Sequence, residues 1–235
     1  MKKYKLVFSL IRNIIPILRF NFHYFPLSQA IKLPVFLNHA HLHVMKGTVR
    51  IETDRIRPGM IRFGYPWTCM KQNKGFHWLN SGGGVIISDR LTIANDSVVE
   101  IGKDGILKIG KNVSFNGGLR LSCQKSITIG DFVLGSWDVS MFDTDFHRMK
   151  NCLTHDKIKS CSLPVVVGDN CWIGFGVTIM KGSQLGNGCI VGAKSLLAKN
   201  YSKAINTVFA GNPALPKKKG FYLDHNDCKP EYEDK

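Results

Sequence analysis

The chain has 235 residues and a formal net charge of +15, enough length for one sizeable core with a small appended segment. The positive charge is compatible with nucleic acid, anionic lipid or acidic small molecules as partners. The basic residues, however, lack the interleaved aromatic residues of an RNA-binding surface. No apolar stretch approaches the length of a spanning helix. The seven cysteines include no CxxC pair, which argues against a zinc module.

The first 51 residues contain no acidic residue and many apolar ones. Lysines 2, 3 and 5 precede a short apolar run that hints at a signal peptide, but Arg12 interrupts it and no clear cleavage site follows. The apolar residues from Leu6 to Phe22 can share one helical face, although Pro16 would kink it. Residues 1–45 are therefore expected to cap the fold, to contact a membrane surface, or to do both.

Residues 46–100 are rich in β-forming residues but irregular, and we expect an inserted loop at 65–80 containing Trp67, His77 and Trp78. Further along, an aliphatic residue returns at every sixth position: Val167, Ile173, Ile179, Leu185, Val191 and Leu197. Neither an amphipathic helix nor an alternating strand has this period, whereas a parallel β-helix of hexapeptide repeats does. An ordinary β-sandwich with glycine-rich turns is the less fitting alternative.

Three hexads would close one triangular coil of about eighteen residues. The fifth position of each hexad is small or aliphatic, so Cys171 and Cys189 are expected to be buried thiols of a reducing compartment. The period fails between Met141 and Val167, which predicts a loop at 142–166 extruded from an otherwise regular coil. The predicted β-helix spans 46–200, followed by a C-terminal extension at 201–235.

The segment from Ile109 to Ala214 carries several motifs together, including Asn116, Asp145-Phe146-His147, the stretch from Val167 to Gly174, and Ala210 to Ala214. With these motifs the chain resembles the hexapeptide-repeat acyltransferases, in particular the xenobiotic and sugar O-acetyltransferases. Residues 29–34 resemble the opening of bacterial acyltransferases of surface-polysaccharide assembly. The resemblance implies an all-β fold, a left-handed parallel β-helix, and a homotrimer with active sites between subunits. It also implies acetyl-CoA as co-substrate and no metal.

His147 is the expected general base, because a sugar hydroxyl needs one to attack a thioester at neutral pH. His155 is its rival in the same loop. Asp145 or Asp143 is expected to orient the imidazole or to contact substrate, with a turn-capping role as the equal alternative. The resemblance implies that Asn116 binds the acceptor and that the backbone amide of Phe175 stabilises the oxyanion.

The donor side of the site follows from the resemblance as well. Trp172 would form an apolar wall, and Gly174, Gly192 and Ala193 would lie along the pantetheine arm of coenzyme A. Lys199 and Lys217 are candidates for its phosphates.

The resemblance therefore implies an O-acetyltransferase that acts on a sugar hydroxyl in capsule, O-antigen or exopolysaccharide synthesis. We expect a cytoplasmic protein, peripheral on the membrane, with a free, nucleotide-linked or lipid-linked sugar as acceptor and no nucleic acid partner. One alternative is a non-catalytic β-helix scaffold. The other is a metalloprotein like the γ-carbonic anhydrases, which need three gathered histidines.

Overall fold

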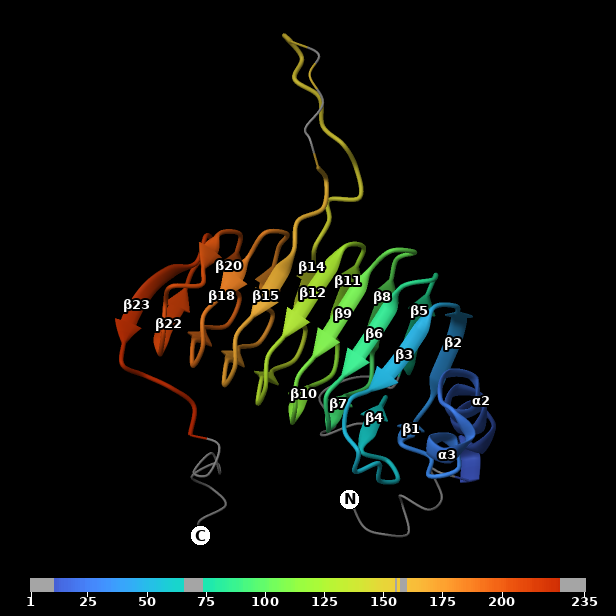
Figure 1. Cartoon of the computed structure of the whole chain (residues 1–235). Coiled ribbons are helices and arrows are strands. Elements are labelled where there is room, and N and C mark those ends of the chain that lie inside the picture. The colour runs from blue at the N-terminus through green and yellow to red at the C-terminus, as the bar shows by residue number, and fades with distance from the viewer. Residues whose placement is uncertain (1–10, 66–73, 155, 157–159, 225–235) are drawn as a thin grey trace.

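The structure is a computed structural model that describes residues 11–65, 74–154, 156 and 160–224. Its strands wind into a left-handed parallel β-helix with three faces (Figure 1). This confirms the predicted all-β fold class and its handedness, which departs from the usual right-handed crossover between parallel strands. Each coil contributes one short strand to each of three sheets, here named A, B and C.

Sheet A contains β1 (Val35–Leu37), β4 (Ile61–Phe63), β7 (Leu91–Ile93), β10 (Val113–Phe115), β13 (Leu134–Gly135), β16 (Trp172–Ile173), β19 (Ile190–Val191), β22 (Thr207–Ala210) and β23 (Leu215–Lys219). Sheet B contains β2 (Ala40–Met45), β5 (Phe76–Asn80), β8 (Ser97–Ile101), β11 (Arg120–Cys123), β14 (Ser140–Phe142), β17 (Thr178–Ile179) and β20 (Leu196–Leu197). Sheet C contains β3 (Thr48–Ile51), β6 (Gly84–Ile87), β9 (Ile106–Ile109), β12 (Ser126–Ile129), β15 (Val165–Val167), β18 (Gln184–Leu185) and β21 (Asn200–Tyr201).

The coil begins and ends differently from the expected span of 46–200. The first strand starts at Val35, and β5 takes Phe76 to Asn80 out of the loop expected at 65–80. His77 and Trp78 therefore lie in a strand, while Trp67 falls outside the described residues. At the other end β22 continues sheet A beyond position 200, and β23 turns back antiparallel to it. Residues inserted between the early strands hide the six-residue period there.

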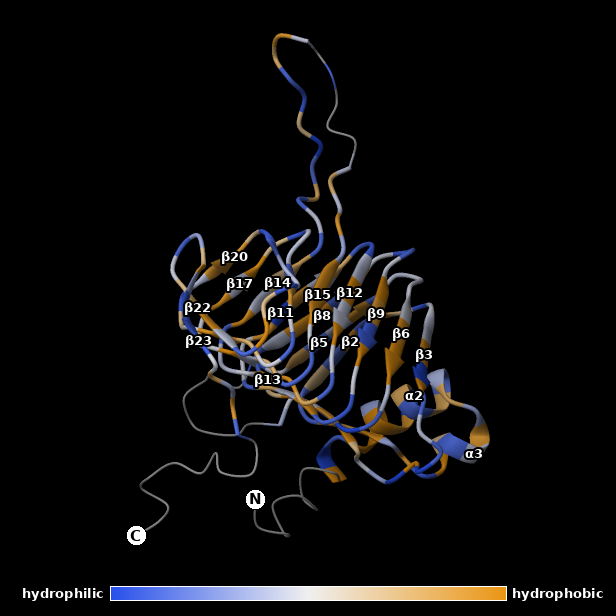
Figure 2. Cartoon of the chain, turned by 60° about the vertical axis from the view of Figure 1, so that its left-hand side comes forward, coloured by the Kyte–Doolittle hydropathy of each residue, from blue (hydrophilic) through white to orange (hydrophobic). Residues whose placement is uncertain are grey.

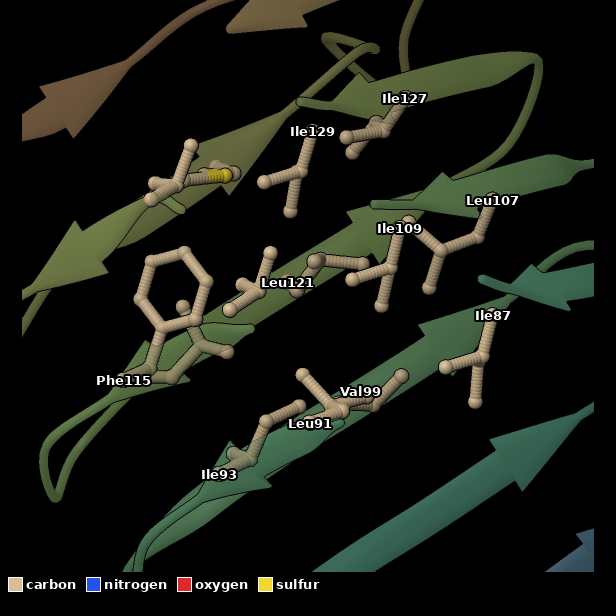
Figure 3. Close-up of a cluster of buried hydrophobic side chains, with 14 of the residues drawn as sticks. Ile87, Leu91, Ile93, Val99, Leu107, Ile109, Phe115, Leu121, Ile127 and Ile129 are labelled. Atoms are coloured by element: carbon tan, nitrogen blue, oxygen red, sulfur yellow. The ribbon is translucent and has the colours of Figure 1, made fainter. Parts of the chain in front are cut away.

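Aliphatic side chains from all three sheets, together with a few aromatic ones, fill the interior, as Figure 3 shows for ten labelled residues between Ile87 and Ile129. In the more regular part of the coil, a large side chain is accommodated where the next coil has a residue without a side chain. Phe115 is such a case, because a Cβ on Gly135 would lie 2.0 Å from its ring. Glycine at position 135 is thus a packing requirement of the coil.

A column of side-chain hydrogen bonds runs along the corner between sheets C and A. The Asp131 carboxylate accepts the amide of Lys111 at 2.7 Å, and the Asp169 carboxylate accepts the amide of Asp131 at 2.8 Å. One coil further on, the side-chain oxygen of Asn187 accepts the amide of Asp169 at 3.0 Å. These bonds satisfy corner amides that strand pairing leaves open. The Gly130-Asp131 and Gly168-Asp169 motifs are therefore structural in this fold.

Two helices cover the N-terminal end of the coil: α2 (Ile14–Tyr24) and the short α3 (Leu27–Ala30). Ile17 and Phe20 are buried, and the Phe20 ring packs 5.3 Å from Trp78, centroid to centroid. The buried Asn21 amide donates to the carbonyl of Val35, and its oxygen accepts the Val35 amide, at 2.8 and 3.0 Å. One side chain thereby pairs with the exposed edge of β1 as a neighbouring strand would.

Neither helix is long and apolar enough to cross a bilayer, and the same holds for every helix in the part of the chain that is described.

The inward cysteines give a test of the packing. Burial raises the pKa of the Cys123 and Cys171 thiols to about 12, and burial also raises the pKa of Cys189. At pH 8 a pKa of about 12 leaves a thiolate fraction on the order of 10⁻⁴, so these thiols should resist iodoacetamide in the native protein. The exposed Cys152 should react, as should Cys161, whose pKa is lowered chiefly by its hydrogen bond to Ser162.

Mass spectrometry of alkylated peptides would measure this difference. Labelling of Cys171 as fast as that of Cys152 would mean that the corner beside it opens in solution. A urea-unfolded sample, in which all seven thiols of the chain should react, serves as the control.

Candidate functional site

The extruded loop expected at 142–166 leaves the coil after β14 and rejoins it at β15, on the corner between sheets B and C (Figure 1). Its outgoing and returning segments are hydrogen-bonded to each other where they meet the coil. The Asp145 amide donates to the carbonyl of Cys161 at 2.9 Å, and the Ser162 hydroxyl donates to Thr144 at 2.9 Å. The loop therefore has a defined root, from which residues 146–154 project beyond the coil.

Asp143 lies inside this root and is fully buried. Its carboxylate accepts three backbone N–H groups, from Gln124, Lys125 and Ser126, at 2.7 to 2.8 Å. These amides form the equivalent corner of the preceding coil. The geometry favours the structural alternative for this residue, because the lone pairs that would contact substrate are occupied by backbone donors.

Asp145 and His147 occupy a tight turn just outside the coil. The Asp145 carboxylate forms an ion pair with Lys181, and its carbonyl accepts the His147 amide at 2.7 Å. Between them Phe146 adopts a φ of +60°, a conformation that residues other than glycine rarely adopt. The turn holds the His147 side chain exposed to solvent. Ion pairing with Lys181 directs the Asp145 carboxylate toward the next coil.

Most of the other predicted residues lie on a different corner, between sheets A and B. Asn116 follows β10, Gly174 and Phe175 follow β16, and Gly192 and Ala193 follow β19. Backbone bonds stack these corners, for example from the Gly174 amide to the carbonyl of Val191 at 2.8 Å. The structure thus brings the predicted donor-side residues Gly174, Gly192 and Ala193 together on one ridge, along with Asn116 and Phe175.

The ridge has close backbone packing and an aromatic surface. A Cβ on Gly174 would lie 2.6 Å from the carbonyl oxygen of Val191, so only glycine fits. The Phe175 ring is 39% exposed, and the ammonium of Lys194 sits 4.5 Å from its centroid. The ridge therefore presents an exposed aromatic ring with a cation above it.

Within one chain the two corners do not converge. The corner that carries Phe175 precedes the strands of sheet B, and the loop that carries His147 follows them. The three-residue strand β14 (Ser140–Phe142) lies between the two corners in the coil that carries the loop, which corresponds to about 10 Å of extended chain. Within one chain, His147 and Phe175 therefore lie toward opposite ends of the strands of sheet B.

The remaining predicted residues are dispersed. Trp172 points outward from β16 in sheet A and is 39% exposed. Lys199 lies on the corner that carries the loop, after β20, whereas Lys217 lies in β23 on sheet A. The two lysines are thus not gathered around one phosphate site within a single chain. His155 falls outside the described residues.

Sequence reasoning missed one cluster, in which His41, His43 and His77 stack on the outer face of sheet B. Centroids of the His41 and His77 rings are 4.6 Å apart, and a nitrogen of His43 lies 2.8 Å from one of His77. Burial, and secondarily His41, lowers the pKa of His77. Because these imidazole rings are stacked and hydrogen-bonded to each other, their nitrogen atoms do not converge on one metal position. No group of three metal ligands is formed among the residues that the structure covers.

A groove of about 520 Å³ lies on the third corner, between sheets C and A. It is lined by Phe132, Asn170, Asn206 and Tyr222 among others, and it contains none of the predicted residues. Its walls belong to the corner that carries the column of side-chain hydrogen bonds described above. The groove is therefore a surface feature of the stacked coil, and the loop and the ridge are the better candidates for chemistry.

Comparison with known proteins places these features in a family context. The bacterial transferase hexapeptide family (six repeats) matches residues 164–199. A putative lipopolysaccharide biosynthesis O-acetyl transferase, WbbJ of Escherichia coli strain K12, is 32% identical over 121 residues, which are 47% of this chain and 59% of that protein. The galactoside O-acetyltransferase of the same strain is 33% identical over 107 residues, 46% of this chain and 51% of that protein.

Among solved structures, the polySia specific acetyltransferase NeuO covers 84% of this chain and 94% of its own, with a TM-score of 0.53 at 19% identity. This likeness concerns the fold. The matches span between half and two thirds of the length of the two curated relatives. Together the comparisons confirm the resemblance to hexapeptide-repeat acetyltransferases.

The buried carboxylate in the loop root gives a test that separates structure from chemistry. Removing it in Asp143→Ala leaves three corner amides unpaired, so we expect a loss of about 3 kcal/mol in the free energy of unfolding. Asp145→Ala, which removes a partly exposed ion pair in the same root, should cost less than about 1 kcal/mol. Urea denaturation of both variants measures the difference. Unchanged stability in Asp143→Ala would return the residue to the candidate substrate ligands.

Proposed function

We propose that this chain, which carries the bacterial transferase hexapeptide repeat, is an acyl-CoA-dependent O-acetyltransferase. It would move an acetyl group from acetyl-CoA to a sugar hydroxyl in the synthesis of a bacterial surface polysaccharide. The observation that carries the proposal is the loop that interrupts a regular coil and presents His147 to solvent on an ordered turn. The names of the curated relatives, O-acetyl transferases of lipopolysaccharide and galactoside, support the sugar acceptor.

In the proposed reaction neutral His147 takes the proton of the sugar hydroxyl while the hydroxyl oxygen attacks the thioester carbonyl. The carbon–sulfur bond then breaks, and the imidazolium returns the proton to the departing thiolate. The products are an acetyl ester and free coenzyme A. No acyl-enzyme is formed. The backbone amide of Phe175 would stabilise the oxyanion that forms between the two steps.

The ridge between sheets A and B would hold the donor. The pantetheine arm would lie along the stacked backbone of Gly174, Gly192 and Ala193, and Trp172 would form an apolar wall beside it. Asn116, on the same ridge, would hold the acceptor. Because Lys199 and Lys217 lie apart in one chain, their role in binding the coenzyme A phosphates requires that different subunits contribute them.

The separation of His147 from this ridge supports a shared site in a closed homo-oligomer, which we propose to be a trimer. Five free cysteines in the described part of the chain, three of them buried, fit a reducing compartment such as the cytoplasm. The alternative hypothesis, a non-catalytic scaffold, accounts for the coil but does not explain the ordered turn at His147.

Loss of the base should abolish transfer without disturbing the fold. For His147→Ala we expect kcat to fall by about 10²- to 10⁴-fold, the usual contribution of general base catalysis, with unchanged melting temperature. Release of coenzyme A thiol from acetyl-CoA is measured across sugars, nucleotide sugars and lipid-linked glycans. His155→Ala is the matched control in the same loop and should retain activity. Acceptor-dependent release that survives in His147→Ala would overturn the assignment.

A mixing experiment tests whether the site is shared. His147→Ala lacks the base, and Ala193→Trp, a change at an exposed position, obstructs the ridge. Each variant alone should be inactive. If each site takes its histidine and its ridge from different subunits, random mixing in equal amounts should restore roughly a quarter of wild-type activity, since one interface in four receives both intact halves. Refolded mixtures that stay inactive would mean that each chain builds its own site.

A further inference from the structure

Helix α2 has two apolar faces, and only one of them is used by the fold. Ile17 and Phe20 point into the coil and are 1% exposed. On the opposite side lies a stripe with helical spacing that continues onto α3. We call it the cap face; it comprises Ile11, Ile14, Ile15, Leu18, Phe22, Leu27 and Ile31, all exposed in the structure.

The cap face is unusual for this molecule in its density of exposed apolar groups. Ile15 is 76% exposed and Leu27 is 68% exposed. Figure 2 shows the hydrophobic residues of α2 and α3 together at one end of the coil, away from β23. Capping the coil requires only the inward face, so the outward stripe adds nothing to folding. Exposed apolar surface of this kind marks a binding site.

Charge around the cap face identifies its partner. Arg12, Arg19 and Lys32 are exposed among the apolar side chains, and no acidic residue occurs anywhere in the first 51 positions. A basic rim around an apolar stripe suits a helix that lies in the headgroup region of an anionic bilayer. A second copy of the same face would instead oppose cation to cation with no acidic residue to pair them.

We propose that the cap face docks on the surface of an anionic phospholipid bilayer. The apolar stripe would enter the boundary between headgroups and acyl chains, and the three cations would lie at the level of the lipid phosphates. Docking would place the coil on the membrane by its N-terminal end. The proposal stands on the cap alone and does not depend on acetyl transfer.

Co-sedimentation of the full chain with vesicles tests it. Binding is expected to vesicles of phosphatidylglycerol and phosphatidylethanolamine, with much weaker binding to phosphatidylcholine. Ile15→Ser combined with Phe22→Ser should weaken binding by roughly tenfold or more, because two exposed apolar side chains no longer enter the bilayer. Ile205→Ser with Leu215→Ser removes two exposed apolar side chains elsewhere and should leave binding unchanged.

The charge requirement has its own matched pair. Arg12→Gln with Arg19→Gln should weaken binding to anionic vesicles by roughly 30-fold, since each cation near the surface contributes a factor of about five. Lys218→Gln with Lys219→Gln lowers the net charge equally on β23 and should have little effect. Circular dichroism confirms that each variant is folded.

Three results would overturn the proposal. The first is full binding by the Ile15 and Phe22 double variant, and the second is an equal loss in both charge variants. The third is a wild-type protein that ignores anionic vesicles but dissociates on gel filtration when Ile15 and Phe22 are changed, which would assign the cap face to contacts between copies.

Discussion

Hydrogen bonding between successive coils is the constraint on which this structure depends. A strand of two or three residues cannot satisfy its own backbone, so each coil relies on the coils before and after it. The two ends of such a stack expose unpaired backbone. The chain solves the problem differently at each end: Asn21 pairs with Val35 through its side chain, and β23 folds back antiparallel on β22. Both devices follow from the same requirement.

The same constraint decides where chemistry can occur. The interior is filled by apolar side chains and the strands are hydrogen-bonded to their neighbours, which leaves the corners as the places where the chain can vary. One corner column is used for stability, through Asp131 and Asp169. The other two carry the loop with His147 and the ridge with Phe175. A strand of sheet B separates these two corners within one chain.

The regular part of the coil and the position of the loop were predictable because the hexad period records them directly in residues 167–197. The first two coils were not, because inserted residues displace the period between their strands and polar side chains such as His41 face outward in them. The role of Asp143 could not be read from its neighbours in sequence, since its three partners lie about twenty positions earlier and meet it only through coil stacking. The histidine cluster likewise depends on the register of β2 against β5.

A stacked coil also has a fixed pitch. Neighbouring parallel strands lie about 4.8 Å apart, and β13 is four steps from β1 in sheet A, so the coil that bears the loop stands about 19 Å from the capped end. Adding or removing a whole coil would change that distance by one strand spacing. The contacts at each corner would remain of the same kind. Distances along the solenoid are thus multiples of the strand spacing. The distance of the loop from the capped end is therefore set in whole coils.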